Sequence, residues 1–165
     1  MTHFDKFDIE TQGDTVTLEA QWRVPFSADQ VFTVLIDFPA MVEWMPDLQE
    51  SRVLDQHVST LRVQQIGRLL GIPLGTELEV GITPGQSVRF RQIQGSFDRF
   101  EGIWEVVPED GQTRIRYRLQ VAHPLIRLAR WLRPYVEAKI IDQIEGLNQY
   151  LHRVYASTRV ADASS

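Results

Sequence analysis

The chain has 165 residues, of which 43% are hydrophobic and 24% charged, and its formal net charge is −5. These proportions are typical of one globular domain with a sizeable core, and they exclude a disordered or fibrous chain. The acidic balance disfavours nucleic-acid binding, which needs a basic surface, and the lack of cysteine excludes disulfides and thiolate metal sites.

The N-terminal sequence predicts neither a secretory signal nor a membrane anchor. Residues 1–10 include acidic side chains and lack an apolar stretch. No apolar run in the chain reaches the roughly 20 residues that span a bilayer. We therefore expect a cytoplasmic protein with one domain over residues 1–157, a frayed N-terminus, and a flexible tail over residues 158–165.

The first predicted elements are a strand and two short helical segments. Apolar and polar residues alternate over residues 15–24, which predicts a strand with one buried face. Ser27 followed by Gln30 has the pattern of a capping box, so a short helix is predicted from there to about Asp37. A second short helical turn is predicted over residues 41–44.

The middle of the chain reads as short strands separated by turns. Pro84-Gly85, Gly95-Ser96 and Glu109-Asp110-Gly111 are turn sequences, and connections this short join antiparallel strands. With the first strand, a seven-stranded sheet results. The six further strands are predicted at Gln49–Gln56, Ser59–Arg68, Gly75–Thr83, Ser87–Gly95, Asp98–Pro108 and Thr113–His123.

The C-terminal part of the chain changes to a helical period. Pro134 lies near the start of this part, so residues 125–133 form either a separate short helix or a kinked first segment. One long helix is then predicted to end near Ala156, because apolar residues recur at steps of three and four. Its apolar face consists of Val136, Ile140, Ile144, Leu147, Leu151 and Val154.

Together these elements predict an α+β fold in two layers. A sheet with one apolar face must cover that face, and only the C-terminal helix is long enough to do so. A curved antiparallel sheet that closes around this helix leaves space beneath it. The sequence therefore predicts an apolar cavity between the sheet and the C-terminal helix.

Several stretches of the sequence carry a family resemblance. They are Arg23-Val-Pro-Phe-Ser-Ala-Asp-Gln-Val-Phe, Asp37-Phe-Pro, Trp44-Met-Pro-Asp-Leu, Gly95-Ser-Phe-Asp-Arg-Phe-Glu-Gly-Ile-Trp-Glu-Val and His123-Pro-Leu. Over residues 16–155 the chain resembles the START-like (SRPBCC) superfamily of polyketide cyclases/dehydrases and lipid-transport proteins, near its coenzyme Q-binding branch. It departs from that branch over residues 38–46, which lack the Pro-Trp-Cys element.

The resemblance implies the helix-grip fold, whose members bind lipids, quinones, polyketides or plant hormones between sheet and helix. Binding or transport of such a hydrophobic small molecule is the leading hypothesis. A polyketide cyclase, aromatase or dehydratase is the first alternative, in which Tyr117 or His123 would move protons. A protein- or ribosome-binding module of the toxin type is the second alternative.

Two groups of side chains are candidates for ligand contacts. Gln92 and Gln94 have the inward parity of their strand, and Gln143 lies beside the apolar stripe of the long helix, so their amides can bond the polar end of a ligand. A β-bulge or a rim position would instead place the strand amides in water. Rigid walls of the cavity are expected from Trp44, Phe90, Phe100, Trp104, Tyr117, Trp131 and Tyr135. Ordinary core packing is the alternative for these rings.

Residues 125–133 form a small basic amphipathic segment, with arginines at steps of three. Such a segment can rest on an anionic membrane, so peripheral membrane contact is one expectation. The alternative is that its apolar side packs against the protein's own sheet.

The sequence predicts no catalytic residue, metal site or cofactor. Acid–base or nucleophilic catalysis needs converging groups, and no such set is visible. The four histidines, His3, His57, His123 and His152, have no ligand spacing.

Overall fold

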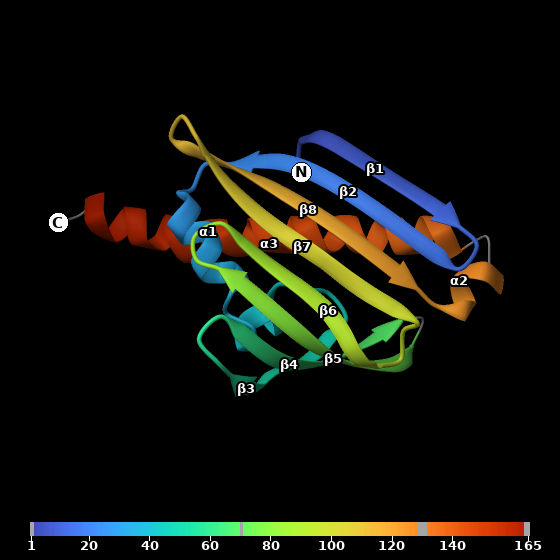
Figure 1. The fold of residues 1–165 in the computed structure, drawn as a ribbon. Helices are drawn as coiled ribbons and strands as arrows, with labels where there is room; N and C mark the ends of the chain where they lie inside the picture. Colours follow the sequence, from blue (N-terminus) through green and yellow to red (C-terminus); the bar gives the residue numbers. More distant parts are fainter. Residues whose placement is uncertain (1, 70, 129–131, 164–165) are drawn as a thin grey trace.

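The computed structural model describes residues 2–69, 71–128 and 132–163. One antiparallel sheet has eight strands in the order β1-β2-β8-β7-β6-β5-β4-β3, and the long helix α3 lies along one face of it (Figure 1). This is the predicted α+β helix-grip arrangement, with one strand more than the seven expected. The strands are β1 (Phe4–Gln12), β2 (Thr15–Val24), β3 (Leu48–Gln56), β4 (Thr60–Leu69), β5 (Ile72–Thr83), β6 (Ser87–Gly95), β7 (Arg99–Glu109) and β8 (Gln112–Ala122).

The additional strand is β1, which pairs with β2 at one edge of the sheet. The prediction of a frayed N-terminus was therefore wrong. Phe4, Phe7 and Ile9 pack against the core, but the register shifts between Phe4 and Lys6. This β-bulge breaks the period-two alternation of apolar residues on which the prediction relied.

The two short helical segments after β2 are confirmed. Ser27 caps α1 (Ala28–Leu35), and its side chain accepts a hydrogen bond from the backbone N–H of Gln30 at 3.2 Å. The Gln30 side chain accepts from the backbone N–H of Ser27 at 3.0 Å, which completes the predicted capping box. The 3₁₀ helix η1 (Pro39–Glu43) follows and leads into β3.

Residues 129–131 lie outside the described ranges, so the choice between a separate short helix and a kinked first segment stays a prediction. Two helical segments flank these residues. They are α2 (Pro124–Leu128) and α3 (Leu132–Ala163), and Pro134 lies in the first turn of α3, where a missing N–H costs no hydrogen bond. Helical backbone continues past the predicted end near Ala156, as far as Ala163. The flexibility of residues 158–165 stays a prediction. No helix in the described ranges is long and apolar enough to cross a membrane.

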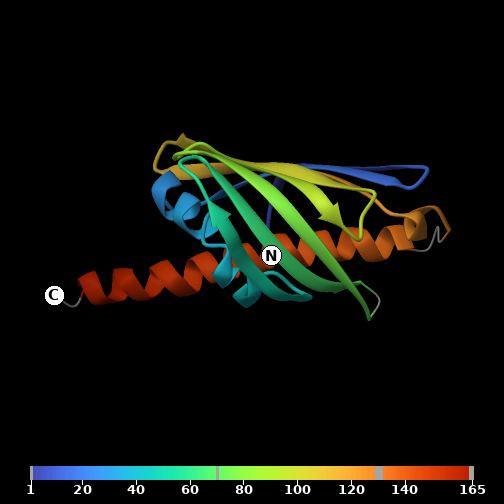
Figure 2. The same cartoon turned by 60° about the horizontal axis from the view of Figure 1, so that its bottom comes forward.

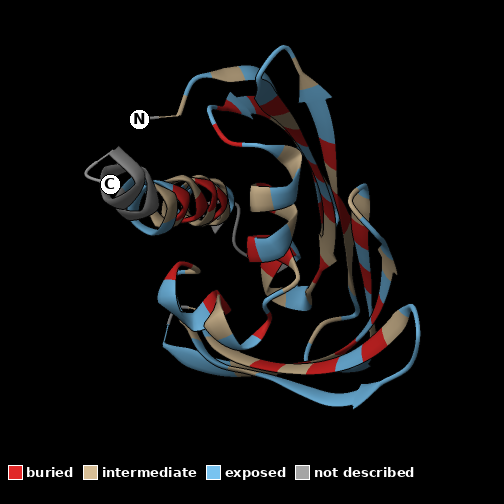
Figure 3. Ribbon diagram, turned by 90° about the vertical axis from the view of Figure 1, so that its left-hand side faces the viewer, coloured by how far each residue is buried: buried red, intermediate tan, exposed pale blue. Residues whose placement is uncertain are grey.

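The buried face of α3 lies inside the curve of the sheet. Figure 2 shows α3 running beneath the sheet, and Figure 3 looks along the helix as the sheet curls past it. Ile144, Leu147 and Leu151 are completely buried, which confirms the predicted stripe, whereas Val154 at its end is 36% exposed. The helix is therefore the cover that the apolar face of the sheet requires.

Aromatic rings fill the middle of the interior. Trp104 stacks on Tyr117 with 3.8 Å between ring centroids and 10° between ring planes. Trp22 and Trp44 each meet Trp104 edge to face at 6.3 Å. Nε1 of Trp22 also donates a hydrogen bond to the side-chain oxygen of Asn148 at 3.0 Å, which ties β2 to α3.

A glycine allows α3 to touch the segment that follows η1. A Cβ atom at Gly146 would overlap the backbone carbonyl oxygen of Trp44. Two helical turns earlier, Nζ of Lys139 lies 2.6 Å from a carboxylate oxygen of Asp47. Residues 44–47 are thus held along α3 at two points, and these contacts set the distance between this segment and the helix.

Replacing Gly146 with alanine is expected to lower the free energy of unfolding by about 1–3 kcal/mol, because the new methyl group must push α3 away from Trp44. At an unconstrained position inside a helix, the same change stabilises by about 1 kcal/mol. The sign of the change in urea unfolding therefore tests the contact.

Gly81→Ala serves as the control for this substitution. A Cβ atom at Gly81 meets nothing within 4 Å, so we expect a change of at most about 0.5 kcal/mol. A Gly146→Ala protein at least as stable as the unmodified protein would contradict the close approach.

Candidate ligand-binding site

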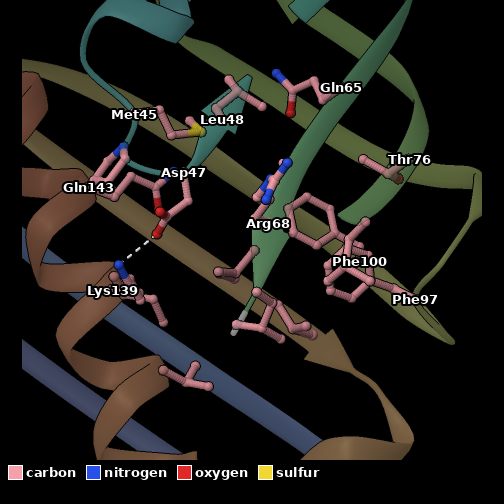
Figure 4. Close-up of a pocket in the computed structure, with 18 of the residues that line it drawn as sticks. Met45, Asp47, Leu48, Gln65, Arg68, Thr76, Phe97, Phe100, Lys139 and Gln143 are labelled. Atoms are coloured by element: carbon pink, nitrogen blue, oxygen red, sulfur yellow. Dashed lines mark ion pairs between the residues drawn. The ribbon is translucent and has the colours of Figure 1, made fainter. Parts of the chain in front are cut away.

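A cavity of about 220 Å³ lies between the sheet and the first turns of α3. Its walls come from residues 45–48, from β4, β5, β7 and β8, and from α2 and α3 (Figure 4). The predicted cavity is therefore present, at one end of the interior. Most of its lining is apolar and consists of Met45, Pro46, Leu48, Leu69, Leu74, Phe97, Phe100, Leu119, Val121, Ile126, Val136 and Ile140.

A smaller void of about 40 Å³ shares part of this lining and reaches the aromatic centre. Phe90 and Trp104 lie on its wall. The ring of Phe90 packs over Gly102, where a Cβ atom would lie 2.6 Å from Cζ of Phe90. Gly102 thus leaves room for the ring of Phe90, and this ring narrows the smaller void.

Tyr117 is the most deeply buried polar side chain of the cavity. The residue is 1% exposed, and its hydroxyl is hydrogen-bonded to the side chain of Gln143 on α3. Burial raises the pKa of the Tyr117 hydroxyl well above its ordinary value near 10, and the bond to Gln143 opposes part of that rise. The hydroxyl therefore stays protonated and can donate a hydrogen bond to a ligand.

Gln65 is a lining residue that the sequence analysis missed. It is 8% exposed, and its Nε2 donates to Oγ of Ser51 at 3.2 Å and to Sδ of Met41 at 3.4 Å. These contacts hold the amide in place. The signal was available in the sequence, because Gln65 continues the inward parity of Leu61 and Val63 along β4.

His123 lines the cavity at the end of β8. Its Nδ1 accepts a hydrogen bond from the backbone N–H of Leu125 at 3.1 Å, and its ring meets Phe97 edge to face at 6.0 Å. Because Nδ1 is the acceptor, the neutral ring carries its proton on Nε2. His123 thus anchors the start of α2 and presents a second hydrogen-bond donor.

Asp47 organises the mouth of the cavity. Its backbone is in the left-handed region, with φ at 64°, a conformation that Asp tolerates better than most residues. Its carbonyl oxygen accepts from the backbone N–H of Arg68 at 3.0 Å, and its carboxylate holds Lys139. This ion pair raises the pKa of the Lys139 ammonium, and desolvation opposes the rise. The turn before β3 is thereby joined to β4 and to α3.

The predicted aromatic walls fall into separate groups. Phe100 and Tyr117 line the main cavity, while Phe90 and Trp104 reach only the smaller void. Trp44 lines neither of these spaces and packs behind Trp104. Its Nε1 has no hydrogen-bond partner among the described residues.

The two remaining predicted rings lie at the start of α3. Tyr135 is half-buried, and its ring lies under Nζ of Lys139 at 5.4 Å from the centroid. It is not among the described lining residues of the main cavity. Trp131 lies outside the residues that the structure describes.

The three amide side chains predicted to contact a ligand lie in three different places. Gln143 lines the main cavity. Gln92 instead accepts from Oγ1 of Thr76 at 2.8 Å and donates to the carbonyl of Phe97 at 2.7 Å, so it holds the turn between β6 and β7. Gln94 is exposed and pairs with Glu77, because a register shift between β5 and β6 reverses its parity. This is the bulge weighed as the alternative for these positions.

Membrane contact through residues 125–133 stays a prediction. Ile126 is 7% exposed and lines the cavity, which agrees with packing against the protein's own sheet at that position. Arg127 and Arg133 are exposed. Residues 129–131 lie outside the described ranges.

Comparison with known proteins gives one family match. A family model described as polyketide cyclase / dehydrase and lipid transport matches residues 24–146, from the last residue of β2 into α3. The match includes residues 45–143, which contain the described lining of the main cavity. No match was found among curated proteins.

Solved structures share the fold at low sequence identity. The TTHA0849 protein of Thermus thermophilus is 22% identical, with a TM-score of 0.71, over 90% of this chain and 99% of that chain. The Zhui aromatase/cyclase of Streptomyces sp. R1128 is 15% identical, with a TM-score of 0.73, over 84% and 94%. A STAR-related lipid transfer protein of Xanthomonas axonopodis is 17% identical, with a TM-score of 0.68, over 90% and 99%.

Tyr117→Phe is expected to change how stability depends on pH. The folded state keeps the Tyr117 proton where the unfolded chain loses it, so the stabilising contribution is full below about pH 10 and falls above it. From about pH 9 to about pH 11, the unmodified protein should therefore lose about 1 kcal/mol more unfolding free energy than the variant. Urea unfolding at the two pH values measures this difference.

Tyr150 and Tyr155 also have raised pKa values, because both are partly desolvated. They are present in both proteins, so their contributions cancel in the comparison. Equal losses of stability in the two proteins would show that Tyr117 ionises normally and is not shielded from water.

Proposed function

The chain belongs to the polyketide cyclase/dehydrase and lipid transport family, and we propose that it binds a hydrophobic small molecule in the cavity between the sheet and α3. The observation that carries this proposal is the cavity itself. It has a volume of about 220 Å³, a mainly apolar lining, and a few polar side chains that include Tyr117 and Gln143.

A hollow of this size favours a ligand over a packing defect. Protein interiors are packed as densely as organic crystals, with few voids larger than one water molecule, which takes roughly 30 Å³ in the liquid. A volume of about 220 Å³ exceeds that several-fold. An apolar molecule that fills it gains roughly 25 cal/mol for each Å² of apolar surface removed from water.

The volume also limits the ligand. Pockets for drug-sized molecules measure roughly 300–1,000 Å³, and this cavity of about 220 Å³ is smaller. It therefore suits a molecule of one or two rings, or the end of a longer chain whose remainder passes through the mouth. A ligand carbonyl or hydroxyl at the inner end would bond with Tyr117 or Gln143, which gives the molecule a fixed orientation.

A cyclase or aromatase activity is the second candidate, and one observation favours it. The Tyr117 hydroxyl and Nε2 of His123 are hydrogen-bond donors on the wall of the same cavity. In an aldol ring closure followed by dehydration, a methylene carbon loses one proton as it bonds to a ketone carbon and a second proton as the double bond forms, and the ketone oxygen takes up two protons and leaves as water. These two donors are the groups that would protonate that oxygen.

Val136→Trp is expected to weaken ligand binding at least tenfold, because the larger ring fills the cavity from α3. Val136 is half-buried on the cavity wall. Binding is measured with the neutral fluorescent probe N-phenyl-1-naphthylamine. Val154→Trp, on the same helix but 36% exposed and outside the described lining, should bind the probe as the unmodified protein does. Equal weakening in both variants would locate the probe elsewhere.

The enzyme candidate predicts a different result for Tyr117→Phe. If Tyr117 is catalytic, this variant should lose turnover of a linear poly-β-ketone mimic at least 100-fold while it keeps the probe affinity within a few-fold. Mass spectrometry detects the product, which is lighter than the substrate by one water. Turnover by the unmodified protein no faster than the buffer reaction would leave only the binding function.

A further inference from the structure

We infer that the natural ligand carries an anionic group, in the simplest case a carboxylate, that pairs with Arg68 at the mouth of the cavity. This inference rests on the proposed binding function and specifies the chemical class of the ligand. In Figure 4 Arg68 lies among the lining residues, with Asp47 and Lys139 to one side and Phe100 to the other.

The charge balance of the lining is the first argument. Asp47 is the one carboxylate among the described lining residues, and it already pairs with Lys139 at 2.6 Å. None of the ion pairs among the described residues includes Arg68. The mouth therefore has a surplus of one positive charge, within a protein whose formal net charge is −5.

The hydrogen-bonding groups of the lining are the second argument. Arg68, Tyr117 and His123 present donors, since Nδ1 of His123 is occupied by the backbone of Leu125. Oγ1 of Thr76 donates to Gln92, so this lining hydroxyl is also engaged. These three donors match a ligand with several acceptor oxygens, such as a carboxylate with a carbonyl or ether oxygen further along.

The depth of each group fixes the direction in which the ligand lies. A carboxylate at the inner end would lose its hydration beside buried apolar rings, and this desolvation costs several kcal/mol. Arg68 is exposed at the mouth, so a carboxylate there keeps part of its water and gains a charge-assisted hydrogen bond. The apolar body then points inward, toward Phe100 and Tyr117.

An isosteric pair of ligands tests the inference by isothermal titration calorimetry. We take 2-naphthoate and 2-naphthamide, which share ring and shape and differ in charge. The unmodified protein should bind the carboxylate about tenfold more tightly than the amide at low salt, about the strength of one exposed charge-assisted bond. Arg68→Gln should abolish this preference and leave the amide affinity unchanged, whereas Arg68→Lys should keep the preference.

Arg89→Gln is the matched control. It removes the same charge, but Arg89 is an exposed residue of β6 that is not among the described cavity-lining residues, so the preference should persist. Far-UV circular dichroism confirms that each variant is folded. A preference lost equally in both variants would indicate net charge and would overturn the assignment to Arg68.

The remaining outcomes separate this inference from the proposed function. If amide and carboxylate bind equally, or if neither binds while N-phenyl-1-naphthylamine does, the anionic class is overturned and the binding function stands. A carboxylate preference that survives in Arg68→Gln also overturns the assignment. If none of the three compounds binds, the proposed function fails and this inference fails with it.

Discussion

The cavity exists because α3 and its opposite wall touch at one end and separate at the other. At Gly146 the helix meets the carbonyl of Trp44, and beyond it Leu147 and Leu151 are completely buried. Toward its start, α3 reaches the same wall only through the long side chain of Lys139, which pairs with Asp47, and Val136 lines the open space. A glycine contact in the middle of one helix thus divides a solid interior from a hollow one.

Most of the fold could be predicted because the alternation of apolar residues records which face of each strand is buried. The prediction failed at bulges, where one extra residue reverses the parity of the positions that follow. The bulge between Phe4 and Lys6 concealed β1, and the shift opposite Glu77 moved Gln94 to the outer face. A bulge depends on pairing between strands, which a single segment does not reveal.

Only part of the candidate site could be predicted, and the reason is similar. Phe100 and Tyr117 have inward parity, Gln143 lies beside the apolar stripe of α3, and all three line the cavity, but these patterns do not tell how far along the sheet the hollow extends. Trp44 and Trp104 face inward and fill the solid end. Asp47 and Lys139 meet at the mouth through an ion pair between the turn and α3, and Arg68 joins them through the hydrogen bond from its backbone N–H to the carbonyl oxygen of Asp47. Both are contacts between residues distant in sequence.

The location of the mouth has an evolutionary consequence. Part of the cavity lining comes from short connections and from places where strands end, such as Asp47, Leu69 and Ile126, whereas of the stacked rings at the centre Tyr117 lines this cavity and Trp104 does not. Mutations at these lining positions can alter which molecule binds while the packed aromatic core stays intact. Proteins that share this fold at 15–22% identity, with TM-scores of 0.71 and 0.73, therefore need not share a ligand.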